Sequence, residues 1–167
     1  MAHFSTQIRI NATKEKVWEV LADIGGIYKW NPGVAHSYST SEKNRGEGVS
    51  RHCDLQSPGG KSIGYLEELA FDWREGEGYK IDIYESNLPI KSNVVEFAVK
   101  ADGDGSIVTA APDYALKYGL LGRLLNKLVV RRMFRKGMED LLTGLKYHIE
   151  TGELVGDRVP DMAAAAV

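Results

Sequence analysis

The longest regular pattern of apolar positions lies near the C-terminal end of the chain. Apolar side chains recur there at spacings of three and four residues, which is typical of one face of an α-helix. The opposite face carries mainly basic side chains. We therefore predict one long amphipathic helix over Gly119–Thr151 that covers a sheet, with Gly152 just past its end. The apolar positions are Leu121, Leu124, Leu125, Leu128, Phe134, Met138, Leu141, Leu142, Leu145 and Ile149.

Two glycines interrupt this predicted helix. Gly137 and Gly144 each cost about 1 kcal/mol relative to alanine in a helix interior. A bend or close packing against a neighbouring element is the simpler explanation, and room for a ligand under the helix is the alternative.

Before this helix, apolar and polar side chains alternate with the period of two that is typical of β-strands. Phe4–Ile10 is the first such segment, and six more follow after residue 33, each bounded by Gly, Pro, Asn, Asp or Ser. The repeated Asp-Gly of residues 102–105 is a strong hairpin signal. The six later strands are predicted at Val34–Thr40, Gly48–Leu55, Ser62–Phe71, Tyr79–Glu85, Ser92–Ala101 and Ser106–Leu116.

Two short helices are predicted between the first strand and the others. Thr13 is a candidate N-cap for a helix with Val17 and Trp18 on its apolar side. Asp23–Tyr28 is expected to form a second short helix or turn. In the stiff loop that follows, Trp30 is a candidate to line the mouth of a cavity.

This order predicts an α+β fold in a single domain, residues 1–152. We expect a seven-stranded curved antiparallel sheet around the long C-terminal helix, with two short helices after strand one. Residues 153–167 lack periodicity, and we expect them to form a flexible tail.

Composition narrows the function classes. The chain has 21 Lys and Arg against 23 Asp and Glu, which gives no electrostatic case for a nucleic-acid partner. The start lacks a leader pattern and no apolar run spans a bilayer, so we expect a cytoplasmic protein without integral membrane contact. The single cysteine, Cys53, excludes an intrachain disulfide and a cysteine-based zinc cluster, and we expect it to be a small buried hydrophobe. We find no nucleotide-binding fingerprint, and we expect no cofactor and no metal.

The first half of the chain carries a recognisable set of residues. Val17-Trp18 in the first helix and Trp30-Asn31-Pro32 after the second resemble the START/Bet v 1-like (SRPBCC) superfamily, and more narrowly the polyketide cyclase/dehydrase and lipid-transport family. The resemblance covers residues 3–150 and implies a helix-grip fold with a cavity between sheet and long helix, which hosts transporters, receptors and cyclases. The matching positions are Ala12, Val17, Trp18, Leu21, Asp23, Trp30 and Pro32, followed by Gly46-Glu-Gly48, Arg51, Glu67, Asp72 and Leu88-Pro89.

Two positions depart from the family pattern. Asn93 and Ala110 stand where aromatic residues are common in this branch. The resemblance therefore implies an interior that is roomier or more polar than usual.

Strand alternation singles out one pair of charges. It places Arg51 on the apolar face of its strand, and Glu67 with Tyr65 on the apolar face of the next strand. A charge taken out of water needs a partner, so we predict an inward Arg51–Glu67 pair. It is either an inert buried ion pair or a polar anchor for a carboxylate or enolate.

The remaining candidates are weaker. Tyr65 and Tyr114 are predicted to lie in the cavity, and Leu128 and Met138 to cover it from the long helix. His36 and His52 lack ligand-like spacing, and His52 is assigned to the solvated face. The basic cluster Arg131, Arg132, Arg135 and Lys136 is either a solvated helix face or a contact for anionic lipid headgroups.

Three functions follow. The leading hypothesis is binding of a small hydrophobic molecule, lipid-like or aromatic, between sheet and long helix. The second is a cyclase or dehydratase in which Arg51 stabilises an enolate and Glu67 or Tyr65 moves protons. The third is a protein-partner module that uses the exposed face of the sheet or helix. Ligand-binding candidates are Trp30, Arg51, Tyr65, Glu67, Tyr114, Leu128 and Met138, and a homodimer is left open.

Overall fold

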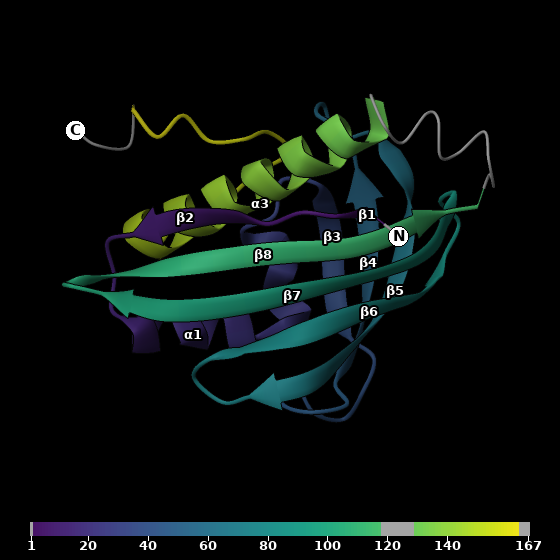
Figure 1. Cartoon of the computed structure of the whole chain (residues 1–167). Coiled ribbons are helices and arrows are strands. Elements are labelled where there is room, and N and C mark those ends of the chain that lie inside the picture. Colours follow the sequence, from purple (N-terminus) through teal and green to yellow (C-terminus); the bar gives the residue numbers. More distant parts are fainter. Residues whose placement is uncertain (1, 118–128, 164–167) are drawn as a thin grey trace.

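The computed structural model describes residues 2–117 and 129–163, and these form one curved antiparallel sheet with a long C-terminal helix (Figure 1). The predicted α+β helix-grip arrangement is therefore confirmed. The strands are β1 (Ala2–His3), β2 (Thr6–Ile10), β3 (Val34–Ser39), β4 (Ser50–Gln56), β5 (Ser62–Arg74), β6 (Gly78–Ser86), β7 (Ile90–Asp102) and β8 (Gly105–Leu116). The helices are α1 (Lys14–Ala22), the 3₁₀ helix η1 (Ile24–Lys29) and α3 (Arg131–Thr151).

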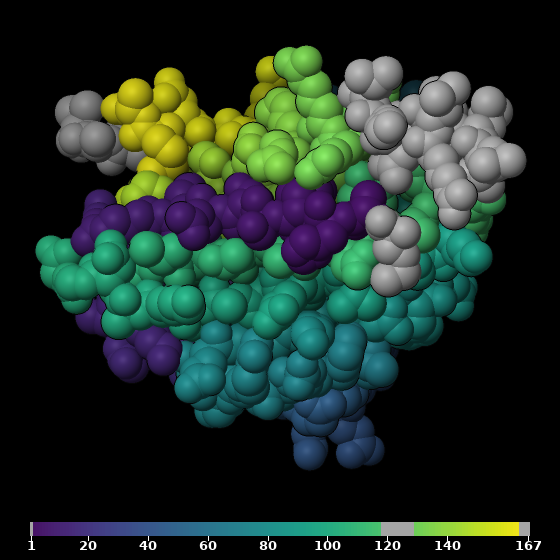
Figure 2. Space-filling view, in the orientation of Figure 1, coloured from purple at the N-terminus to yellow at the C-terminus, as the bar shows by residue number. Residues whose placement is uncertain are grey.

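The sheet order is β1-β8-β7-β6-β5-β4-β3, with β2 also paired to β8. The predicted first strand, Phe4–Ile10, corresponds to β2, and β1 is an additional short strand before it; both pair with successive parts of β8. The described sheet therefore has eight strands where seven were predicted. Figure 2 shows β2 between α3 and β8 on this side of the molecule.

The two short helices follow the predicted signals. Thr13 is the N-cap of α1 and accepts a hydrogen bond from the Lys16 amide at 3.4 Å. Val17 and Trp18 are buried, as their apolar positions indicate. The second predicted helix is η1, in which the 3₁₀ geometry accommodates Gly25-Gly26.

α3 ends where the glycine signal indicates. Gly152 adopts a left-handed φ of 78° and its amide donates to the His148 carbonyl oxygen. The buried positions of α3 are Leu141, Leu142, Gly144, Leu145 and Ile149, in the predicted apolar stripe. The part of the predicted helix from Gly119 to Leu128 lies outside the described residues.

The two interior glycines of α3 have different surroundings. A Cβ atom at Gly144 would lie 2.1 Å from the Trp30 carbonyl oxygen, so this glycine permits close contact between α3 and the loop after η1. A Cβ atom at Gly137 would meet nothing within 4 Å among the described residues. Close packing thus explains Gly144 but not Gly137.

The described part of the C-terminal tail lies against the domain. The Val155 side chain is buried, and its amide donates to the Lys29 carbonyl oxygen at 2.9 Å. The Asp157 carboxylate accepts from the Gly59 amide at 2.8 Å. The division into one domain and a flexible tail stays a prediction. No helix among residues 2–117 and 129–163 is long and apolar enough to cross a membrane.

Candidate ligand site

The main core lies between the concave face of the sheet and the helices. On β7, the inward positions are Asn93, Val95, Phe97 and Val99, and all four side chains are buried. Trp30 belongs to this core, and Met138 packs against it from α3. Ligand roles for Trp30 and Met138 stay predictions, and Leu128 lies outside the described residues.

A second aromatic cluster lies near the described start of α3. Tyr114 on β8 is fully buried and stacks on Phe134 of α3, with ring centroids 4.1 Å apart and an angle of 1° between the planes. Phe4 packs edge-on against Tyr114 at 6.5 Å, and the Arg135 guanidinium lies 5.0 Å above the Phe4 ring. Burial raises the pKa of Tyr114, so its phenol stays neutral. Tyr114 therefore lies in the interior, and its place in a ligand cavity stays a prediction.

A polar side chain stands beside this cluster. Asn93 is directly opposite Tyr114 in the β7–β8 register and is only 4% exposed. Its Oδ1 atom has no hydrogen-bond partner among the described residues. An unsatisfied buried acceptor costs about 1–3 kcal/mol, so it calls for an explanation such as a bound donor.

Trp30 has a buried hydrogen-bond donor without a partner among the described residues, whereas Asn93 has a buried acceptor. The indole is 2% exposed, and its Nε1–H group has no acceptor among the described residues. Among the described residues, three buried side-chain atoms thus lack a partner: Oδ1 of Asn93, Nε1 of Trp30, and Oδ1 of Asp113, which lies on the other face of β8 from Tyr114.

Arg51 points into the core, but its partner is not the predicted one. The Arg51 guanidinium donates from Nε to Glu68, which lies directly opposite on β5, and from Nη1 to the Ile24 carbonyl oxygen at 2.9 Å. Both side chains of the pair are almost fully buried. Burial opposes the charge on Arg51, but the Glu68 carboxylate more than compensates and raises the pKa of the guanidinium. The predicted Arg51–Glu67 pair is wrong.

Glu67 and Tyr65 lie on the opposite face of β5, outside the core. The Glu67 carboxylate lies 2.5 Å from Nδ1 of His52, and Tyr65 donates to Glu85 at 3.0 Å. Their predicted place in the cavity is therefore wrong. The inward positions of β5 are Leu66, Glu68 and Ala70, one residue out of step with the predicted set.

Cys53 behaves as the sequence indicates. It is 1% exposed, and burial raises the pKa of its thiol well above the ordinary value. Its Sγ atom lies 3.4 Å from Glu68. A protonated, buried thiol is a poor nucleophile, so Cys53 is part of the core.

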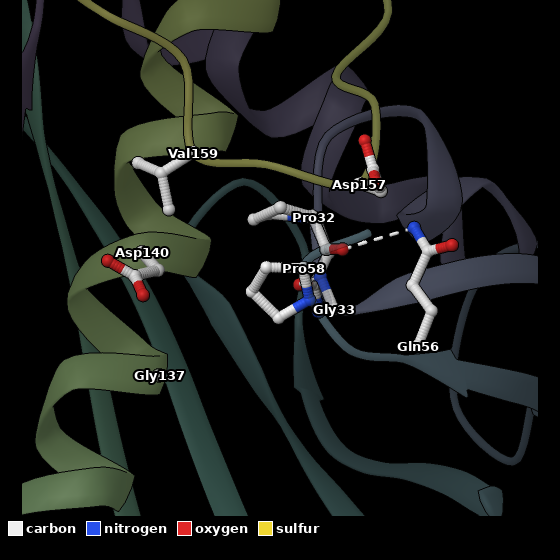
Figure 3. Close-up of a pocket in the computed structure, with 9 residues that line it drawn as sticks. Pro32, Gly33, Gln56, Pro58, Gly137, Asp140, Asp157 and Val159 are labelled. Atoms are coloured by element: carbon white, nitrogen blue, oxygen red, sulfur yellow. Dashed lines mark hydrogen bonds between the residues drawn. The ribbon is translucent and has the colours of Figure 1, made fainter. Parts of the chain in front are cut away.

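A small open pocket of about 130 Å³ lies between residues 31–33 of the loop after η1 and α3 (Figure 3). Gly137 and Asp140 face it from α3, and Pro32 faces it from the loop. Gln56 donates to the Pro32 carbonyl oxygen at 3.2 Å. The lining is completed by Asn31, Gly33, Pro58, Asp157 and Val159. The open space beside Gly137 therefore belongs to this pocket.

Sequence reasoning did not select as site residues two rings of the aromatic cluster, nor Asn93 beside it. Phe4 and Phe134 were visible only as apolar positions in a strand and a helix. Asn93 was visible as a departure from the family pattern, and its polar side chain at an inward strand position was the available signal. Among the described residues, no group of three or more His, Cys, Asp or Glu side chains is suited to a metal ion.

Known structures share this fold. The protein TTHA0849 from Thermus thermophilus is 19% identical with a TM-score of 0.75, over 90% of this chain and 99% of that one. A START superfamily protein from Mycobacterium smegmatis is 14% identical with a TM-score of 0.68, over 89% and 97%. The di-domain ARO/CYC BexL from the BE-7585A biosynthetic pathway is 12% identical with a TM-score of 0.72, over 90% of this chain and 47% of that one.

A comparison with curated protein sequences gives no match. The family model described as "Polyketide cyclase / dehydrase and lipid transport" matches residues 1–150. This match covers most of the 167 residues. The chain therefore belongs to the polyketide cyclase/dehydrase and lipid-transport family.

Proposed function

We propose that this protein binds a small, largely apolar molecule between the concave face of the sheet and α3, beside Asn93 and Tyr114. The observation that carries the proposal is the buried Oδ1 atom of Asn93, which has no partner among the described residues and stands next to a stacked pair of aromatic rings. Apolar sites with a few polar groups are the usual form of small-molecule sites.

The chemistry of this end of the interior defines the ligand class. The rings of Tyr114, Phe134 and Phe4 favour contact with a flat ring or a hydrocarbon chain. The Asn93 oxygen favours a ligand hydroxyl or N–H group, which would donate to it and remove the cost of the unpaired acceptor. We therefore infer a hydrophobic ligand with at least one hydrogen-bond donor.

The contacts of Arg51 favour binding over the predicted cyclase chemistry. Its guanidinium is already occupied by Glu68 and by the Ile24 carbonyl oxygen. Glu67 and Tyr65, the predicted proton carriers, contact His52 and Glu85 on the other face of the sheet. These contacts argue against the predicted roles of the three residues in stabilising an enolate inside the fold.

The test begins with native mass spectrometry of the protein purified from its own host, followed by denaturation and identification of any released compound. We expect a stoichiometric hydrophobic compound with a hydroxyl or N–H group. An empty protein that also binds no member of a panel of lipids and aromatic compounds would contradict the proposal.

A substitution then tests the assigned polar contact. Asn93→Leu should lower the affinity for the identified ligand at least about fivefold, because one hydrogen bond contributes about 1 kcal/mol. The same substitution should leave the affinity for an analogue without the hydrogen-bond donor unchanged. Ser92→Ala, at the neighbouring outward position of β7, is the matched control and should bind both compounds as the parent does.

A further inference from the structure

The outer face of β3–β6 carries a continuous row of aromatic and imidazole rings. Tyr28 and His36 lie 6.1 Å apart between ring centroids, and His36 lies 5.6 Å from Tyr38. His52 is stacked between Tyr38 at 5.3 Å and Tyr65 at 5.8 Å. Four of these rings cross three neighbouring strands on the side of the sheet that faces away from α3, and Tyr28 of η1, which packs partly against the core, ends the row.

Strand register explains why the rings and a set of carboxylates share this face. Tyr38, His52 and Glu67 are direct cross-strand partners, and Glu67 is opposite Glu85 on β6. In the adjacent row, His36, Asp54 and Tyr65 are cross-strand partners. Because register neighbours on one face lie side by side, the two rows form one surface.

This surface is acidic and exposes aromatic area. Its carboxylates are Asp54, Glu67, Asp82 and Glu85, with Asp82 opposite Leu69 in the β5–β6 register. Tyr38 is 48% exposed and Tyr84 is 55% exposed. No lysine or arginine occurs in 34–39, 62–69 or 82–86, and the single arginine in 50–56 points into the core. The remaining cations of β5 and β6, Arg74 and Lys80, are already paired with Glu96 and Asp72.

The carboxylates hold the central ring in place. Nδ1 of His52 lies 2.5 Å from Glu67, and its Nε2 lies 3.2 Å from Asp54. The Asp82 carboxylate has no hydrogen bond or ion pair with the described part of the chain, and the Glu85 carboxylate accepts only from the Tyr65 hydroxyl there. Acceptors for added cations therefore remain beside the exposed rings.

We propose that the outer face of β3–β6 is a docking surface for a basic segment of a partner protein, rich in arginine. Charge complementarity identifies the occupant: guanidinium groups pair with carboxylates and also stack on aromatic rings. The surface uses the convex side of the sheet, so it is separate from the proposed ligand site and goes beyond the proposed function.

The experiment measures binding of fluorescein-labelled nona-arginine to the full chain by fluorescence anisotropy, with nona-glutamate as the peptide control. We expect nona-arginine to bind and nona-glutamate not to bind. An increase in NaCl from about 50 to about 300 mM should lower the affinity for nona-arginine at least about tenfold. Chemical-shift changes in a two-dimensional NMR spectrum should concentrate at residues 36–38, 52–54, 65–67 and 82–85.

Matched variants separate this surface from general attraction to an acidic protein. Tyr38→Ser and Glu85→Gln should each lower the affinity for nona-arginine at least about threefold. Glu15→Gln removes the same charge from α1 and should have no effect. Equal affinities for parent, Tyr38→Ser and Glu85→Gln, or no binding at all, would overturn the proposal. Self-association of the chain through this face without peptide would also overturn it, because the occupant would then be a second copy.

Discussion

Arg51 and Glu68 stand directly opposite each other on β4 and β5, and they form an ion pair within the core. The guanidinium also donates to the Ile24 carbonyl oxygen, so the pair connects the sheet to η1 by a hydrogen bond. Nearby, the Tyr79 hydroxyl donates to the Leu21 carbonyl oxygen at 2.9 Å. The side chains of the sheet thus satisfy backbone carbonyl groups where α1 meets η1.

Removing one partner of this pair should be costly. Arg51→Met leaves the Glu68 carboxylate buried without a counter-charge, and we expect it to lower the free energy of unfolding by about 3–5 kcal/mol. The double variant Arg51→Met/Glu68→Leu should recover most of the loss, because it removes both charges. Urea denaturation at pH 7 measures all three proteins. A single variant within about 1 kcal/mol of the parent would show that the pair contributes little to the fold.

The two interior glycines of α3 should respond in opposite directions to alanine. Gly144→Ala forces a Cβ atom against the Trp30 carbonyl oxygen, and we expect a loss of about 1–3 kcal/mol. Gly137→Ala meets open space, and we expect a gain of about 0.5–1 kcal/mol from helix propensity. Thermal unfolding compares each with the parent. Destabilisation by both substitutions would contradict the difference in their surroundings.

His52 should make stability depend on pH near neutrality. The hydrogen bond with Glu67 raises the pKa of His52 above its ordinary 6.5, with a further contribution from Asp54. The stability that this provides is fully present below pH 6.5 and is lost as the pH rises through the pKa of the folded state. NMR titration of the imidazole should show the raised pKa, and Glu67→Gln should return it toward 6.5. The free energy of unfolding of His52→Gln should fall less than that of the parent between about pH 6 and pH 9.

The contribution of Glu75 to stability should depend on pH in the opposite direction, because it is lost as the pH falls. Its carboxylate accepts from the indole N–H groups of Trp18 and Trp73 at 2.9 and 2.8 Å and pairs with Arg45. These contacts lower the pKa of Glu75 to about 2. Its contribution is therefore present above pH 4.5 and is lost as the pH falls through about 2.

Glu75→Gln tests this carboxylate in acid. We expect the parent to lose more free energy of unfolding than the variant between about pH 5 and pH 2, as followed by tryptophan fluorescence. Glu77→Gln, two residues away on the same turn, is the matched control and should behave as the parent does. Equal acid profiles for parent and Glu75→Gln would show that the indole contacts do not form in solution.

The order of elements could be predicted because it depends on local patterns. The N-cap at Thr13, the left-handed Gly152 and the Asp-Gly turn before Gly105 each satisfy backbone requirements through neighbouring residues alone. The strand β1 could not be predicted, because its two residues are too few to show an alternation and it is defined only by its pairing with β8.

The candidate site could be predicted less well, and β5 shows why. Its sequence Tyr65-Leu66-Glu67-Glu68-Leu69-Ala70 places apolar residues on both sides of two adjacent glutamates, so either parity puts one glutamate on an apolar face. Only the cross-strand register decides that Glu68 meets Arg51. The aromatic outer face, with Tyr65 stacked on His52, made the wrong parity the more apolar one.

The position of β2 has a consequence for synthesis of the chain. Thr6 pairs with Ala110, and the amide of Asn11 and the carbonyl oxygen of Arg9 bond to Glu150 and Lys146 of α3. Because β8 is the strand that pairs with β2, β2 can pair only after roughly 100 further residues have been synthesised, which takes about 5–20 s of translation. Its contacts with α3 require about 140 further residues, since Asn11 and Glu150 are 139 positions apart. Until β8 and α3 have been synthesised, the edge of β2 is open to other partners.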